Sequence, residues 1–195
     1  MAPYFETVKS FADVPITDAG VETAPFIEAA DGLVLMFDLL GSGIFGFVQN
    51  DIRNNINGVR SRFQALPDQT HSLEQLVRTD NEPKHATPCL VRLIRGLLFT
   101  CRALQHMQRD RNAALHVCFK RSYDEVLKHH HNFVIRSTVS VAIRAVPYRN
   151  DFYNRIAQGG SHERLDEELA KWLDGLDKVV SHVERFLREG GYGRV

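Results

Sequence analysis

The feature that most narrows the possible folds is the spacing of apolar residues near the end of the chain. Seven of them recur at alternating intervals of four and three residues: Leu165, Leu169, Trp172, Leu176, Val179, Val183 and Phe186. Because an α-helix turns about 100° per residue, this spacing puts all of them on one face. Ser161 is placed to cap the start of this helix, and Gly190 to end it. The repeat is shorter than four heptads, which favours a stripe packed on the protein's own core over a coiled coil.

The helical period recurs along the rest of the chain, and no segment alternates convincingly as a strand would. Helices are predicted at about 25–40, 44–65, 88–109, 112–128, 130–146 and 149–158, with a short one after Ser72. The first 20 residues are expected to be an irregular lead-in. Gly41 and Pro147 are predicted stops. The chain is therefore predicted to be all-α, with about eight helices in a single domain spanning residues 1–195.

Two helix starts are suggested by local residue patterns. Ser72 and Gln75 have the spacing of a capping box for the short helix. Thr87 and Pro88 are expected to supply the N-cap and first turn of the helix that follows.

The charge balance excludes some classes of partner. Lys plus Arg is 24 and Asp plus Glu is 24, whereas nucleic-acid binders normally have a basic excess. The N-terminal MAPYFETVKSF lacks a signal-peptide pattern, and no apolar run approaches ~20 residues. The three cysteines, Cys89, Cys101 and Cys118, suggest reduced core thiols. We expect a cytoplasmic protein that is a monomer and binds no nucleic acid.

No pattern of residues predicts catalysis or a metal site. The run His129–His131 lies in a predicted helix, where neighbouring side chains point ~100° apart and do not chelate one ion together. The chain has no glycine-rich phosphate loop, zinc spacing or nucleophile elbow. The expectation is that the protein is not an enzyme and needs no cofactor.

Arg92 interrupts an apolar helix in the stretch PCLVRLIRGLLF. Helical geometry puts Arg95, Arg102, His106 and Arg109 on one line, predicted to face solvent. Arg92 lies instead with Gly96, Phe99 and Ala103. A guanidinium in apolar surroundings needs a partner, which is either a core carboxylate or a ligand.

A second polar line borders an apolar stripe in residues 44–65. Asp51, Asn55, Gly58 and Arg62 share it. A carboxylate and an amide one turn apart beside apolar residues suit recognition of a polar head on an apolar body. The alternative is that Asp51 and Asn55 are ordinary polar residues at the boundary of the core.

Several stretches, in order, resemble the glycolipid transfer protein superfamily, and the fungal heterokaryon-incompatibility C type most of all. They are FDLLGSGIFGFVQNDIRNNI, LVRLIRGLLFT, LKHHHNFVI and AVPYRNDFY. The resemblance implies an all-helical two-layer sandwich that holds one sphingolipid, with its chains between the layers and its head group at a polar surface site. It also implies brief contact with a membrane surface during transfer.

The resemblance also suggests roles for individual residues. It places the family's head-group aspartate and asparagine at Asp51 and Asn55, and its histidine at His131, where Asp51 would bind the ceramide amide N–H and His131 the amide carbonyl. Phe133 falls on the family's membrane-docking aromatic. Tyr148 and Tyr153 lie in the segment expected near the same face.

Two positions depart from the glycolipid pattern. Arg92 replaces the tryptophan on which a sugar stacks, and a guanidinium suits phosphate better. The ceramide-1-phosphate branch has an arginine there and a second one turn earlier, where this chain has Pro88. Gly58 replaces a head-group lysine, and Arg62 is one turn beyond it, from where it is expected to reach back to the head group.

The sequence therefore predicts an intermembrane carrier of one ceramide-based lipid, either ceramide-1-phosphate or a simple glycosphingolipid, with a slight preference for phosphate. The alternative is a lipid-binding or sensing module with altered head-group selectivity and little transfer activity. A hydrolase is disfavoured because no nucleophile accompanies Asp51 and His131.

Overall fold

The structure is a computed structural model, and it describes residues 2–39, 46–81 and 84–195. Within this part of the chain the elements follow a single order: α1 (Tyr4–Thr7), η1 (Phe11–Asp13), β1 (Ile16–Thr17), β2 (Gly20–Val21), α2 (Thr23–Leu39), α3 (Gly46–Ala65), η3 (Pro67–Gln69), α4 (Leu73–Arg78), α5 (Ala86–Arg109), α6 (Leu115–Val126), η4 (Lys128–His130), α7 (Phe133–Arg144), α8 (Arg149–Ala157) and α9 (His162–Glu189). The predicted all-α class is confirmed. The stop predicted at Gly41 and the helix start predicted near Ile44 lie outside the described residues.

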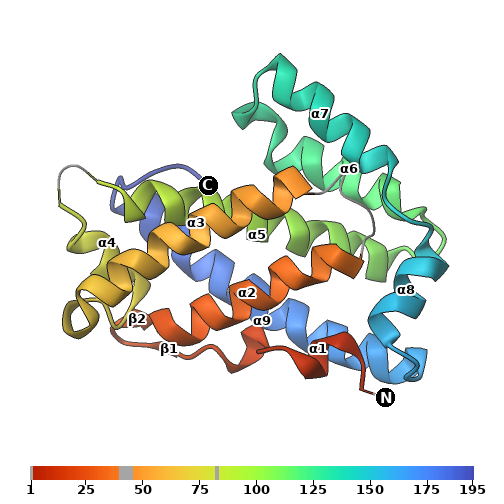
Figure 1. The fold of residues 1–195 in the computed structure, drawn as a ribbon, viewed down its shortest axis with the longest axis horizontal. Helices are drawn as coiled ribbons and strands as arrows, with labels where there is room; N and C mark the ends of the chain where they lie inside the picture. Colours follow the sequence, from red (N-terminus) through yellow and green to blue (C-terminus); the bar gives the residue numbers. More distant parts are fainter. Residues whose placement is uncertain (1, 40–45, 82–83) are drawn as a thin grey trace.

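The helices form two layers around α5. Figure 1 shows α2 and α3 in front of α5 and α9, while α6 and α7 extend the molecule at the upper right. α5 packs against α3, α4, α6 and α9. The final helix buries its predicted stripe from Leu165 to Val183, and only Phe186 at its end stays partly exposed. The residues of this stripe from Leu165 to Val183 are central to the core, because each is 2% exposed or less.

The lead-in is more ordered than the sequence suggested. β1 and β2 pair antiparallel, with Ile16 opposite Val21. Phe5 and Phe11 are buried against Trp172 of α9, with ring centroids 5.1 and 5.3 Å away. The expectation of irregular structure missed these contacts because short segments that take their stability from distant partners have no periodicity of their own.

The predicted capping box is confirmed, whereas the predicted N-cap of α5 is wrong. Ser72 and Gln75 exchange side-chain and backbone hydrogen bonds at the start of α4. Thr87 lies inside α5, and the cap position belongs to His85, whose side chain makes no cap bond. The buried carboxylate of Asp80 supplies the acceptor instead, receiving the backbone N–H of Thr87 at 2.7 Å. A residue from the preceding loop therefore accepts a hydrogen bond from a backbone N–H in the first turn of α5, which has no partner within the helix.

The sequence predicted that the three adjacent histidines lie in an α-helix, and this prediction is wrong. His129 and His130 end the 3-10 turn η4, and His131 has extended backbone. Asn132 then starts α7, its side chain accepting the N–H of Ile135 at 3.0 Å. This break directs His130 and His131 away from the line of α6, so they turn towards α3 and α5.

We expect Asp80→Asn to destabilise the protein by about 1–2 kcal/mol at pH 7, as loss of a buried helix cap does. Burial opposes ionisation of Asp80, but bonds from the backbone N–H groups of Thr87, His85 and Ala86 outweigh it and lower its pKa. A lowered pKa stabilises the fold above the unfolded-state pKa, and this contribution is lost as pH falls through the folded-state value. Denaturant unfolding should show the difference between native protein and variant shrinking below about pH 4.

The control for this prediction is Asp68→Asn, which changes an exposed carboxylate. It should alter the free energy of unfolding by less than about 0.5 kcal/mol at either pH. If both variants behaved alike, Asp80 would not be the cap of α5.

Candidate functional site

A cavity of about 470 Å³ lies between α3, α5 and α7. Its described lining is mostly apolar: Phe37, Phe47, Val48, Ile52, Gly96, Phe99, Phe119, Leu127, Ile135, Val139, Ala142 and Ile143. Five polar residues complete that lining: Asp51, Arg92, Arg95, His130 and His131. Its volume is in the range of ligand pockets, and an apolar wall with few polar groups is their usual composition.

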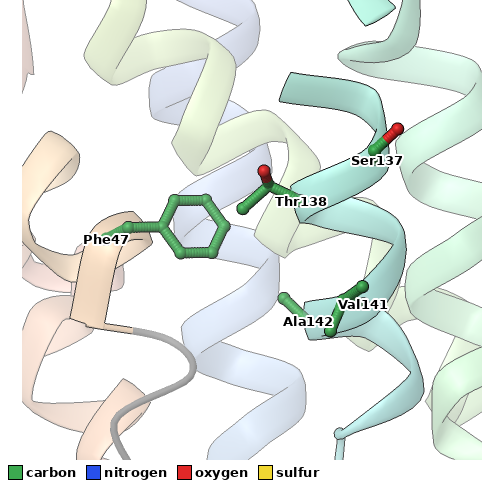
Figure 2. Close-up of a pocket in the computed structure, with 5 residues that line it drawn as sticks. All are labelled: Phe47, Ser137, Thr138, Val141 and Ala142. Atoms are coloured by element: carbon green, nitrogen blue, oxygen red, sulfur yellow. The ribbon is translucent and has the colours of Figure 1, made fainter. Parts of the chain in front are cut away.

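The apolar wall continues to the surface between α3 and α7. A second hollow of about 350 Å³ shares Phe47 and Ala142 with the cavity. Figure 2 shows the Phe47 ring pointing from the start of α3 towards Thr138 and Ala142 on α7. The two hollows thus follow one seam between the helices.

Asp51 and Asn55 are organised as a pair. Asp51 is exposed and lines the cavity, whereas Asn55 is 4% exposed and does not. The Asn55 amide donates to the Asp51 backbone carbonyl at 2.8 Å and to its carboxylate at 3.3 Å. Asn55 therefore holds the Asp51 carboxylate in place from behind and does not face the cavity itself.

The side chain of Arg92 is exposed at the cavity rim, so the predicted burial of its charge is wrong. Within the described residues it forms no ion pair with Asp51, the carboxylate that shares the cavity lining. The guanidinium is therefore open to a ligand at the rim.

Arg95 is the polar residue that the sequence analysis misplaced. It was assigned to the solvent stripe, but it is half-buried and lines the cavity beside Arg92. Burial and the positive charge of Arg92 lower its pKa. The adjacent Gly96, which also lines the cavity, was the only local hint, because it leaves space on that side of α5.

His131 is fixed by a neighbour on α6. Its Nδ1 lies 3.2 Å from the hydroxyl of Tyr123. Burial lowers the pKa of His131, and the opposing charge of Asp51 does not outweigh it, so the ring is neutral at pH 7. When the Tyr123 hydroxyl donates to Nδ1, the ring proton lies on Nε2, and that nitrogen can then donate to a ligand.

His130 is a second neutral imidazole at the polar end. Burial is the largest cause that lowers its pKa to about 4, followed by electrostatic interactions with Arg95, with the neighbouring His129 and His131, which would repel a second charged imidazole, and with Arg194. Its Nε2 is buried and has no hydrogen-bond partner within the described residues. Sequence reasoning gave His131 a ligand-binding role but considered His130 only as part of a possible metal site, and so it missed this position.

The structure places Arg62 outside the cavity. Its Nη2 donates to the backbone carbonyl of Thr79 after α4, so it does not reach back over Gly58 as expected. At Gly58 itself an added Cβ would lie 2.4 Å from Cys89 Sγ and 2.9 Å from Cys89 Cβ. The glycine is there because α3 and α5 touch, which leaves no space for a lysine.

The three aromatics expected on the docking face are in different environments. Phe133 is 83% exposed at the start of α7 and Tyr148 is 85% exposed before α8. Tyr153 packs inward, donating to Asp166 at 3.1 Å, and burial together with the Asp166 charge raises its pKa to about 12. In this structure Tyr153 is therefore part of the α8–α9 contact.

In the described ranges, no group of three or more His, Cys, Asp or Glu side chains could hold a metal ion. None of the helices in the same ranges is long and apolar enough to cross a membrane.

Comparison with known proteins gives consistent matches. A family model described as glycolipid transfer protein matches residues 21–158. A glycolipid transfer protein of Aureobasidium melanogenum is 37% identical over 187 residues, or 94% of this chain and 92% of that protein. HET-C2, a fungal glycolipid transfer protein of known crystal structure, is 41% identical with a TM-score of 0.88, over 95% of this chain and 96% of that one.

A more distant structure shares the fold alone. Human ceramide-1-phosphate transfer protein in complex with 12:0 ceramide-1-phosphate has a TM-score of 0.85 at 21% identity, covering 98% of both chains.

We expect Gly58→Lys to destabilise the protein by about 1–3 kcal/mol, because the added Cβ overlaps Cys89. Cys89→Ala removes the nearer of the two overlapping atoms and should recover part of that loss. Denaturant unfolding of both single variants and the double variant would measure this as a coupling of at least about 0.5 kcal/mol. Purely additive effects would show that the contact between α3 and α5 does not limit position 58.

Proposed function

Because the chain belongs to the glycolipid transfer protein family, we propose that it is a carrier that moves one ceramide-based sphingolipid at a time between membranes, with its head group at the rim formed by Asp51 and Arg92. The carrier acts as a monomer in the cytosol and makes no covalent change to its lipid. The observation on which this rests is the cavity, which combines a long apolar wall with a small polar end.

The polar end suits a ceramide amide. An amide presents one N–H donor and one carbonyl acceptor. Asp51 is an acceptor held in place by Asn55, and the Nε2 proton of His131 is a donor fixed by Tyr123. Both groups line the cavity, and the charge of Asp51 acts on His131, so both halves of the amide find a partner and neither is left unsatisfied in an apolar site.

The apolar seam suits the hydrocarbon chains. Ile135, Val139 and Ile143 of α7 face Val48 and Ile52 of α3 across the cavity. Only Val139, Ala142 and Ile143 of α7 are buried. Such sparse packing lets α7 separate from α3 at small cost, and the lipid chains would then bury the inner face of α7.

Arg92 favours phosphate as the head group. An exposed guanidinium at the rim makes bidentate charge-assisted bonds to phosphate and offers a sugar face little apolar area. The names of the two closely similar fungal proteins refer to glycolipid, so the sugar lipid is the direct competitor. The proposed cargo is a ceramide-1-phosphate-like lipid.

The test is vesicle-to-vesicle transfer of fluorescent ceramide-1-phosphate and fluorescent galactosylceramide by the native chain and Arg92→Trp. The native chain should move the phosphate lipid faster, and the variant should shift the ratio towards the sugar lipid by about tenfold or more, the effect of losing one charge-assisted bond.

The other outcomes of this test are also informative. Transfer of the sugar lipid alone by the native chain would keep the carrier and reject the phosphate cargo. Binding of either lipid without transfer would favour the sensing module, for which the departures at Arg92 and Gly58 are the motivation. Absence of both binding and transfer would reject the proposal.

Membrane docking is proposed to use the exposed start of α7. Phe133 and Val134 are 83% and 71% exposed and lie next to the cavity-lining Ile135. Apolar side chains at an interface bind reversibly through the area they bury. Phe133→Ala should slow transfer severalfold and leave lipid binding in detergent-free solution nearly unchanged.

The matched control for docking is Ile16→Ala in β1, which removes an exposed apolar side chain at the edge opposite α7 (Figure 1). It should leave the rate of lipid transfer and the lipid binding in solution unchanged. Equal losses of transfer and binding in Phe133→Ala would contradict a docking role.

A further inference from the structure

The C-terminal tail reaches the polar end of the cavity. After α9, Tyr192 stacks on Phe186 with ring centroids 5.2 Å apart. Gly193 has φ +155° and lies so close to Val91 that an added Cβ would be 2.7 Å from it. Figure 1 shows this tail running back beside α5. A stacked ring and a glycine-only conformation therefore set the path of the tail.

The end of the tail is bound by the cavity residue Arg95. Both Nε, at 2.9 Å, and Nη2 of Arg95 donate to the backbone carbonyl of Arg194. Arg194 itself is exposed, and its charge acts on His130, which lines the cavity. The charge of Arg194 is therefore close enough to act on a residue of the cavity lining.

The charges at this end do not balance. Among the described lining residues, Asp51 is the only carboxylate, opposed by Arg92 and Arg95, with two neutral imidazoles. Positions 58 and 88, a glycine and a proline, add no cation. An excess of positive charge in one place favours binding of an anion.

We infer that Arg92, Arg95 and Arg194 form one binding site for the phosphate of an anionic ceramide lipid, with Arg194 brought to it by the C-terminal tail. The inference rests on the proposed carrier function and deepens it. The site takes a phosphate monoester, because three guanidiniums from two directions suit a small tetrahedral anion of high charge.

The bond to the tail does not use up Arg95. A guanidinium has five N–H donors in a planar fork, and the Arg194 carbonyl engages only Nε and Nη2. The Nη1 edge stays available to an anion. Arg95 is therefore both a ligand of the phosphate and the positioning residue for Arg194.

The experiment measures binding and transfer of ceramide-1-phosphate and galactosylceramide with the same acyl chain, in zwitterionic phosphatidylcholine vesicles. Arg194→Gln and Arg95→Gln should each lower affinity for the phosphate lipid by about tenfold and change affinity for the sugar lipid less than about twofold. Inorganic phosphate, as a competitor without chains, should displace little lipid at similar concentration.

The matched control is Arg109→Gln, which removes the same charge from an exposed position of α5. It is fourteen residues beyond Arg95, or about 21 Å along the helix, and should change neither affinity. Unfolding midpoints of all variants check that the fold is kept.

The remaining outcomes overturn the inference in distinguishable ways. Unchanged phosphate-lipid affinity in Arg194→Gln would remove the tail from the site, and tighter binding would make the tail a competitor for Arg95. Equal loss for both lipids would make these arginines structural. Sugar-lipid transfer by a native chain that does not bind the phosphate lipid would end the inference and leave the carrier function standing.

Discussion

The geometry of the site depends on how closely α3 approaches α5. At Gly58 there is no space for a side chain against Cys89, and at Gly96 of α5 an added Cβ would come within 3.7 Å of Ile52 on α3. Two helices that touch at these points must present the residues between them to a common edge. Asp51 from α3 and Arg92 from α5 therefore meet at one rim of the cavity, although 41 positions separate them in the sequence.

The polar end is a compromise between charge and solvation. Both histidines are held neutral by burial, which avoids the cost of two more buried cations. The charges that remain are at the exposed rim or half-buried, where solvent reduces their repulsion. Under the proposed function, this repulsion is modest in the protein alone and is relieved when the anionic head group binds.

At the apolar end of the cavity, the helices that stabilise the fold differ from the helix that the proposed function uses. α9, α5 and α2 bury their apolar faces almost completely, whereas α7 leaves Phe133, Val134 and Val141 exposed. A helix with few buried residues adds little to the stability of the fold. Its exposed side chains are available to a membrane and its inner ones to hydrocarbon chains, so weak packing is concentrated in the element that the proposed function needs to move.

The sequence by itself determined the features that depend on contacts within a single helix. The stripe of α9, the capping box at Ser72 and the all-α class follow from periodicity and local hydrogen bonding, which act over a few residues. The pairing of Asp51 with Asn55, one turn apart, could be anticipated for the same reason, and the family resemblance identified the same end of the cavity.

Only the tertiary structure decided which partner each of these faces meets. Arg95 was predicted to face solvent, but it lines the cavity because the tail, α3 and η4 all lie on its side of α5. Asp80 replaced Thr87 as the acceptor at the start of α5, and Tyr153 was drawn inward by Asp166. Each of these outcomes depends on a contact between segments distant along the chain. Helical period assigns a residue to a face, but the packing of the whole chain determines whether that face meets solvent, core or ligand.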